Sequence, residues 1–237
     1  MKKDNIITFR VFGRKALFTD AKSKIGGEKT SCLIPTYEAL RRITDNIYWK
    51  PTIKWRILRC RVVLPIQTRA EGAKPLMMST GEHTLSYYTY LRDVCYEVEA
   101  KMEWNEARAD LILDRNEGKH FNMAIRALKE GGRLPVYLGT SECHAYVEPC
   151  VFGQEKGFYD GQNKDWRFGH QFHSFVYPDE AVRPEEKGKM TTLLWEPKMK
   201  HGEIVFLPQE ECVIRRPIKR MHAKKFRKGS NYNGRED

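Results

Sequence analysis

Hydrophobic residues recur along the chain with two different periods, and each period predicts a different element of structure. Short stretches rich in β-branched and aromatic residues alternate apolar and polar positions, as strands with one buried face do. The clearest is 91–102, where every second residue from Val94 to Met102 is apolar and most residues between them are charged. Three further strands are predicted before residue 153, at 6–12, 53–64 and 143–152.

Two segments instead repeat their apolar residues at steps of three and four, as one face of a helix does. The first begins at Pro35-Thr36 and ends before Pro51, and the second runs from 118 to 130 and stops at Gly131-Gly132. The predicted buried stripes are Tyr37, Leu40, Ile43 and Ile47 in the first helix, and Phe121, Ile125 and Leu128 in the second.

These elements follow one another as strand, helix, strand, strand, helix and strand, which is the order of a ferredoxin-like (RRM-like) βαββαβ domain. We therefore expect an α+β fold with this domain at residues 1–152, and an irregular insertion at 65–88. Residues 153–217 hold only short strand candidates between Pro and Gly clusters, and they predict a small antiparallel β appendage. Because many unrelated proteins share this topology, it indicates no function by itself.

The composition is that of a soluble globular protein. Of the 237 residues, 41% are hydrophobic and 31% are charged, and no stretch approaches the roughly 18 consecutive apolar residues that a membrane-spanning helix needs. The first residues lack the apolar region of a signal peptide. Six cysteines occur without a CxxC pair, so we expect reduced thiols rather than a zinc ribbon or a disulfide framework. These features predict a cytoplasmic protein with no membrane partner, and a monomer when free.

The net charge of +11 lies mostly at one end of the chain. Between Val213 and Asp237, nine basic residues stand against two acidic ones, so this segment carries +7 of the total. It has few apolar residues to bury, and we expect 218–237 to form a disordered tail. Such a tail suits either a solvated terminus or a region that attracts polyanions, including DNA, without sequence preference.

Two motifs partly resemble known binding sites but do not meet the requirements of those sites. The Gly-rich segment 25–31 contains lysine, but Glu28 interrupts the spacing that a phosphate-binding loop requires. His170 and His173 have no carboxylate or cysteine at a spacing that would complete a metal site. No metal site and no cofactor are therefore predicted.

Candidate chemistry is found where the second predicted helix begins. The first turn of a helix presents free N–H groups and a partial positive charge, which favour a phosphate. His120 in that turn can transfer protons, and the adjacent Lys119 can stabilise charge on a phosphoryl group. From these residues alone, the simpler interpretation is favoured, in which His120 caps the helix and Lys119 is solvated.

A second candidate is the segment 48–50, at the end of the first predicted helix. The Tyr48 phenol can hydrogen-bond to a 2′-hydroxyl or a phosphate, Trp49 can stack on a base, and Lys50 can contact the nucleic-acid backbone. The alternative is that both aromatic side chains only close the hydrophobic core.

Several short motifs, in their order and spacing, resemble one family. They are FRVFG (9–13), ALFT (16–19), PTYEAL (35–40), IYWKP (47–51), PIQ (65–67), YLRDV (90–94) and NEGKH (116–120). From about Phe9 to Pro217, the chain resembles the CRISPR-associated proteins of the fifth Cas family, in the subtype that serves type I-C systems. It departs from the family pattern at Ser141, where an Arg is expected.

The resemblance implies a metal-independent endoribonuclease that cuts the repeat hairpin of precursor CRISPR RNA and leaves a 2′,3′-cyclic phosphate and a 5′-hydroxyl. It also implies that the protein stays on the 5′ handle of the mature crRNA as a subunit of the type I-C Cascade complex, beside the backbone and large subunits. One alternative is a scaffold subunit that binds the handle without cutting. A weaker alternative is a basic DNA-binding protein that nicks duplexes with the help of a metal.

The family's catalytic tyrosine, lysine and histidine fall on Tyr48, Lys119 and His120. We expect His120 to act as general acid and base, Lys119 to stabilise the phosphorane, and Tyr48 to orient the nucleophile or the scissile phosphate. The further residues expected to contact RNA are Lys24, Lys29, Trp49, Lys50 and Arg115.

Overall fold

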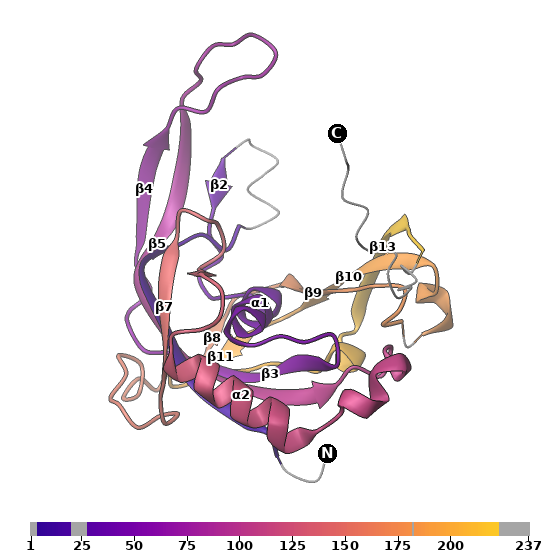
Figure 1. The fold of residues 1–237 in the computed structure, drawn as a ribbon. Coiled ribbons are helices and arrows are strands. Elements are labelled where there is room, and N and C mark those ends of the chain that lie inside the picture. The colour runs from indigo at the N-terminus through magenta and orange to yellow at the C-terminus, as the bar shows by residue number, and fades with distance from the viewer. Residues whose placement is uncertain (1–3, 20–27, 182, 223–237) are drawn as a thin grey trace.

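The computed structural model describes residues 4–19, 28–181 and 183–222 (Figure 1). Its fold is mixed α/β and is built mainly from antiparallel sheets, which confirms the predicted class at that level. Lys24 and the part of the basic tail from 223 to 237 lie outside the described residues.

The main sheet has the strand order β12-β3-β5-β1-β7-β6, and all neighbours along this path are antiparallel. Its strands are β1 (Ile6–Ala16), β3 (Ile53–Val62), β5 (Ser86–Trp104), β6 (Val136–Tyr137), β7 (His144–Pro149) and β12 (Glu203–Val205). The four strands predicted at 6–12, 53–64, 91–102 and 143–152 therefore all form, with shifted bounds.

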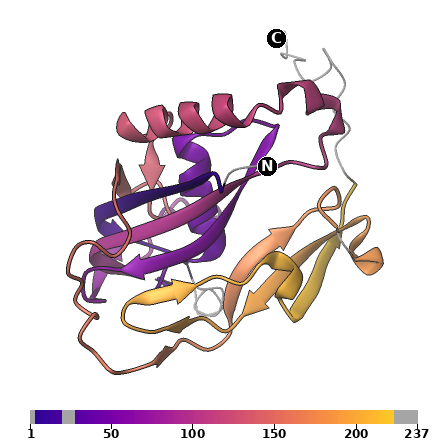
Figure 2. The same ribbon diagram turned by 90° about the horizontal axis from the view of Figure 1, so that it is seen from below.

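Alternation along the strands gives this sheet one apolar face. Phe9 of β1 and Cys60 of β3 both lie opposite Val98 of β5, and all three are fully buried. Two helices, α1 (Tyr37–Ile47) and α2 (Glu117–Lys129), cover that face, and their buried residues join the strands in one hydrophobic cluster (Figures 1 and 2). Removing this apolar surface from water is the main driving force that holds the helices against the sheet.

The first helix forms as predicted. The Thr36 hydroxyl caps α1 by accepting a hydrogen bond from the Ala39 amide at 3.2 Å. The predicted apolar stripe is buried against the sheet. The helix ends at Tyr48, its C-cap residue, whose amide still donates to the helix. The local sequence thus places the Tyr48 side chain at the end of α1.

The second helix buries a face that only overlaps the predicted one. Leu128 is buried as expected, but Phe121 and Ile125 are only partly buried, and the inward positions include His120 and Ala124. Small residues at the contact let the helix backbone approach the sheet closely, while larger side chains fill the space at its flanks. The prediction was wrong in part, because it assumed that the largest apolar residues mark the centre of the inward face, whereas Phe121 and Ile125 pack against the core from its edge.

The predicted irregular insertion is in part a hairpin arm. β4 (Thr68–Ala73) pairs antiparallel with the first part of β5, and β2 (Lys29–Thr30) pairs with β5 in parallel. β5 therefore begins at Ser86, and Figure 1 shows β4 and β5 extending away from the helices as an arm. Most of β4 is exposed, so this segment lacks the apolar alternation on which strand prediction depends.

The C-terminal part is antiparallel, as predicted. β9 (Gln171–Val176), β10 (Lys189–Trp195) and β13 (Ile214–Arg220) form a sheet in the order β13-β10-β9, and β8 (Trp166–Arg167) pairs with β11 (Lys198–Met199). Three short 3₁₀ segments occur among the described residues, at η2 (Ala109–Asp114), η3 (Pro184–Glu186) and η4 (Gln209–Glu211). β13 reaches Arg220, so the predicted disordered tail does not begin at 218; backbone pairing with β10 orders this basic segment without burying apolar side chains.

An ion-pair network fastens residues 153–160 to the polar face of the main sheet. Arg61 Nη1 lies 3.0 Å from Glu97 Oε2, and Arg61 Nη2 lies 2.7 Å from Asp160 Oδ2. The Gly153 amide donates a hydrogen bond to Glu97 at 2.8 Å. Glu97 is therefore fully buried although it lies on the polar side of β5.

All six cysteines lie in the described ranges as free thiols, and four of them are buried. Burial raises the pKa of the Cys212 thiol to about 11, so this side chain is protonated at neutral pH. The described ranges contain no helix with the length and apolar character to pass through a membrane.

Replacing Glu97 by Ala should lower the free energy of unfolding by about 3 kcal/mol, because it removes a partner of the buried Arg61 guanidinium. Urea unfolding followed by circular dichroism measures the loss. The matched control is Glu148→Ala, which removes a half-exposed partner of Arg10 and should cost about 0–1 kcal/mol. Equal losses in the two variants would contradict a stabilising role for the network.

Candidate active site

Three side chains that are distant in sequence, those of Tyr48, Trp104 and His120, meet where α2 begins. Asn116 caps this helix by accepting a hydrogen bond from the Lys119 amide at 3.0 Å, which sets Lys119 and His120 in the first turn. Tyr48 comes from the end of α1. Trp104, the last residue of β5, packs its ring edge-on against the His120 ring at a centroid distance of 5.9 Å.

His120 is held at both of its ring nitrogens. Nδ1 lies 2.8 Å from the Tyr48 hydroxyl, and Nε2 lies 2.8 Å from the backbone carbonyl of Asp114. A carbonyl oxygen only accepts hydrogen bonds, so Nε2 carries a proton. In the neutral ring Nδ1 is then the acceptor, and the Tyr48 hydroxyl donates to it. The surroundings thus fix one tautomer and point its basic nitrogen at the phenol.

The carboxylate of Asp114 connects the cluster. Its oxygens lie 2.6 Å from Lys119 Nζ, 2.7 Å from the Thr52 hydroxyl, which donates to it, and 3.3 Å from His120 Nε2. Neither Asp114 nor Thr52 was predicted from the sequence. Asp114 is the last residue of the 3₁₀ segment η2 and lies outside every predicted element. In the sequence, the one feature that could have indicated it is its position shortly before the start of a helix.

The charges in this cluster shift the ionisation of its members. Hydrogen bonds from Lys119 and Thr52 lower the pKa of Asp114 to about 2. The same contact with Asp114 raises the pKa of Lys119, so this side chain stays cationic at neutral pH. Burial raises the pKa of the Tyr48 phenol, with a nearby Arg133 opposing the shift. Asp114 and Lys119 therefore form a charged pair beside a neutral phenol.

The cluster is closed on one side and open on the other. Tyr48 and His120 are buried, whereas the Lys119 side chain is about half exposed, at 51%. The guanidinium carbon of Arg133 lies 4.6 Å from the centroid of the Tyr48 ring. Arg133 is exposed and forms no ion pair with any residue of the described ranges. It is a second cation at this site, and sequence reasoning missed it because it lies past the end of α2.

Four of the five residues expected to contact RNA lie in the described ranges, and their surroundings differ. Trp49 is 53% exposed and Lys50 is exposed, and both directly follow Tyr48 at the site. Arg115 already forms an ion pair within the protein, because its Nη1 lies 3.0 Å from a carboxylate oxygen of Glu106. Lys29 lies away from the cluster, on β2 beside the arm, with its ammonium over the ring of Tyr88.

Comparison with known proteins identifies relatives over most of the chain. A family model described as CRISPR-associated protein (Cas_Cas5) matches residues 6–206. A CRISPR pre-crRNA endoribonuclease Cas5d from Thermus thermophilus is 31% identical over 186 residues, covering 74% of this chain and 76% of the relative. A protein of the same name from Mannheimia succiniciproducens is 27% identical over 149 residues, covering 54% of this chain and 64% of the relative.

Two solved structures share the fold. One is the crystal structure of a CRISPR-associated protein, with a TM-score of 0.74 and 33% identity, covering 89% of this chain and 95% of the other. The second is a functionally uncharacterized protein, SMU1763c from Streptococcus mutans, with a TM-score of 0.73 and 34% identity, covering 89% of this chain and 96% of the other. The fold and the family match place the chain among the CRISPR-associated proteins. Within them, the chain belongs to the Cas5 family.

Replacing Lys119 by Met should raise the pKa of Asp114 from about 2 toward its ordinary value of about 4, because the strongest hydrogen bond to the carboxylate is lost. Carboxyl-selective NMR titration measures this pKa. The lowered pKa means that ionised Asp114 stabilises the fold above about pH 4, and that this contribution is lost as the pH falls toward 2. Lys50→Met serves as the control and should leave the pKa of Asp114 at about 2. An unchanged pKa of Asp114 in Lys119→Met would contradict the assignment.

Proposed function

We propose that this protein is a metal-independent endoribonuclease that cleaves the repeat hairpin of precursor CRISPR RNA. The relatives from T. thermophilus and M. succiniciproducens carry the name CRISPR pre-crRNA endoribonuclease, which supports this activity. The observation that carries the proposal is the contact of Tyr48, His120 and Lys119 around Asp114, since it joins a proton-transfer group to a cation at one point.

In the proposed reaction, His120 moves one proton between two oxygens of the RNA. Its Nδ1 accepts the proton of the 2′-hydroxyl, and the 2′-oxygen attacks the adjacent phosphorus. The bond from phosphorus to the 5′-oxygen breaks, and the imidazolium returns the proton to that leaving oxygen. The products are a 2′,3′-cyclic phosphate and a 5′-hydroxyl. No proton is gained or lost overall, so a single imidazole is sufficient.

The two cations act on the charge that forms at phosphorus. Lys119 is half exposed and is held by Asp114, so its ammonium can meet the non-bridging phosphate oxygens of an incoming RNA. Arg133 has a planar guanidinium that can bind a neighbouring phosphate in a bidentate manner. Trp49 and Lys50 extend this surface with a ring for a base and a cation for the RNA backbone.

RNA binding has to open the site before the reaction. The Tyr48 hydroxyl occupies the basic nitrogen of His120, and both side chains are buried. We propose that a phosphate draws Arg133 away from the Tyr48 ring, and that the 2′-hydroxyl then replaces or joins the phenol at Nδ1. Tyr48 thereby orients the nucleophile. In the absence of RNA, the closed site keeps the His120 imidazole shielded from solvent.

We further propose that the core is a ferredoxin-like domain at 1–152, followed by a β appendage that extends from 153 to the end of β13 at Arg220 and then by a basic tail. The strand order β3-β5-β1-β7, with α1 between β1 and β3 and α2 between β5 and β7, supports the ferredoxin-like assignment. The pairing of β12 with β3 ties the appendage to the main sheet.

After cleavage, we propose that the protein remains on the 5′ handle as a subunit of the type I-C Cascade complex, in the cytoplasm and beside the backbone and large subunits. The second candidate function is a scaffold that binds the handle without cutting. The complete burial of Tyr48 and His120 favours that alternative, because a site that stays closed is inert. The basic tail suits additional non-specific contact with DNA.

Replacing His120 by Ala should slow cleavage of the repeat hairpin in EDTA at least ~100-fold, because the only acid–base group is lost, while RNA affinity is retained. End-group analysis of the products and an equilibrium binding assay measure the two quantities. His201→Asn is the control, since His201 has a φ of 50°, which Asn tolerates, and lies outside the site.

Two results of that experiment would overturn the nuclease assignment. If the wild type binds the hairpin but yields no cyclic-phosphate product, the scaffold function stands alone. If cleavage depends on an added metal and is indifferent to the hairpin, a metal-dependent DNA- or RNA-nicking activity replaces it.

Asp114→Asn should reduce the single-turnover rate about 10- to 100-fold with RNA affinity changed less than about 3-fold, because Asp114 acts only by positioning Lys119 and His120. The double variant Asp114→Asn/Lys119→Ala should be only slightly slower than Lys119→Ala alone, a sub-additive loss that a merely structural role of Asp114 would not produce. Asp110→Asn, a carboxylate of the same turn paired with Arg108, is the matched control. Fully additive losses would show that Asp114 does not act through Lys119.

A further inference from the structure

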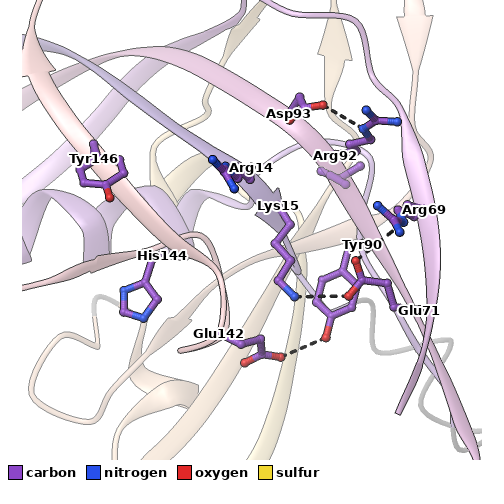
Figure 3. A pocket seen from close by; sticks show the side chains of 11 residues that line it. Arg14, Lys15, Arg69, Glu71, Tyr90, Arg92, Asp93, Glu142, His144 and Tyr146 are labelled. Atoms are coloured by element: carbon purple, nitrogen blue, oxygen red, sulfur yellow. Dashed lines mark hydrogen bonds and ion pairs between the residues drawn. The ribbon is translucent and has the colours of Figure 1, made fainter.

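A second polar cavity lies toward the other end of β5 from the candidate active site. Its volume is 680 Å³, and its walls come from the end of β1, the β4–β5 arm and β7 (Figure 3). Arg92 of β5 lines this cavity, whereas Trp104 of the same strand packs on His120. About 40 Å of strand separates the two residues at the usual rise per residue. The cavity is therefore distinct from the cleavage site.

Three residues of the cavity lining, Arg14, His144 and Tyr146, lie on the face of the sheet that points away from α1 and α2. Along β1, Arg10, Phe12 and Arg14 alternate with residues of the buried face, and His144 and Tyr146 do the same along β7. Phe12 lies opposite Tyr146 in the strand ladder, with their ring centroids 5.9 Å apart. Two paired strands thus present basic and aromatic side chains together on one surface.

Most charges in the cavity are already paired, and one cation is not. Lys15 lies 3.3 Å from Glu71, and Arg92 lies 2.9 Å from Asp93 (Figure 3). Arg14 is exposed and has no ion-pair partner in the part of the chain that the structure describes. Its guanidinium is therefore available to an external anion, and a phosphate fits its planar donor geometry.

The backbone beside Arg14 is also unusual. Asp93 has a φ of 45°, in the left-handed region that few residues other than glycine adopt. In the ladder between β1 and β5, Gly13 pairs with Val94 and Lys15 pairs with Arg92, but Arg14 and Asp93 are left unpaired. Such conformations persist where the surrounding structure holds them, and they cluster at ligand-binding sites.

We propose that this cavity binds a single-stranded segment of RNA, with a base stacked on Tyr146 and a backbone phosphate held by Arg14. Tyr146 is 69% exposed and lies beside Phe12 at a tilt, so its ring is accessible to a base. His144 adds a further polar ring at the rim. This assignment rests on the proposed function, because it identifies where the RNA is held after cleavage. An acidic peptide would use Arg14 but not the exposed ring.

The test is fluorescence anisotropy with a short, unstructured RNA that contains no hairpin, using the full-length protein. Tyr146→Ala should weaken binding about 10-fold and Arg14→Ala about 5-fold, whereas Tyr146→Phe should bind like the wild type, since stacking needs only the ring. Lys198→Ala is the charge control: it removes an exposed cation on β11 and should change affinity less than 2-fold. The single-turnover cleavage rate at saturating protein should stay within 2-fold in every variant, because the cavity is remote from His120.

Wild-type affinity in both Tyr146→Ala and Arg14→Ala would overturn the proposal, and so would an equal loss in Lys198→Ala, which would indicate non-specific attraction. Equal affinity for a DNA strand of the same sequence, with the same dependence on Tyr146, would remove the assignment to RNA. Absence of cleavage in the wild type refutes the nuclease function alone; if Tyr146→Ala still loses RNA affinity in that case, the cavity stands as a binding site.

Discussion

The hydrogen bond between the Tyr48 hydroxyl and His120 Nδ1 is the contact on which the site depends. It joins the end of one helix to the start of another, so it forms only if α1 ends and α2 begins at the same edge of the sheet. Tyr48 is itself the C-cap residue at which α1 ends, and Asn116 fixes the start of α2 through its cap. His120 lies one turn before Ala124 on the buried face of α2, so it points inward. Lys119, one position earlier in the same turn, lies on another side of the helix and is about half exposed.

The two faces of the main sheet have different tasks. The apolar face holds α1 and α2 and thereby sets the geometry of the Tyr48–His120 pair. The polar face carries cross-strand ion pairs, such as the one between Arg61 and Glu97, and residues 153–160 cover part of it. What remains uncovered near β7 is the surface with Phe12, Arg14 and Tyr146. Because side chains alternate along each strand, one set of strands builds both the support for the cleavage site and the second cavity.

The sequence predicted those parts of the fold that bury a regular pattern. β5 from Val94 to Met102 and the stripe of α1 were found because each repeats its apolar residues with one period. The arm was missed because β4 buries neither face, and the inward face of α2 was misassigned because alanine carries little hydrophobic signal. At the site, motif and helix position found Tyr48, Lys119 and His120. Asp114 and Arg133 lie in a 3₁₀ turn and a loop, and only the three-dimensional arrangement brings them to the cluster.

A remote RNA-binding cavity would be of little use to an enzyme that must release its product. Contacts that do not change during the reaction bind substrate and product equally, so they increase affinity without increasing the rate of the chemical step. They also slow product release. For a protein that cuts one RNA and then holds it as part of a larger complex, slow release is the required property. The separation along β5 keeps the two proposed tasks independent: in the proposed mechanism the cluster at His120 changes its contacts as the phosphate reacts, while the proposed RNA contacts of Arg14 and Tyr146 stay the same.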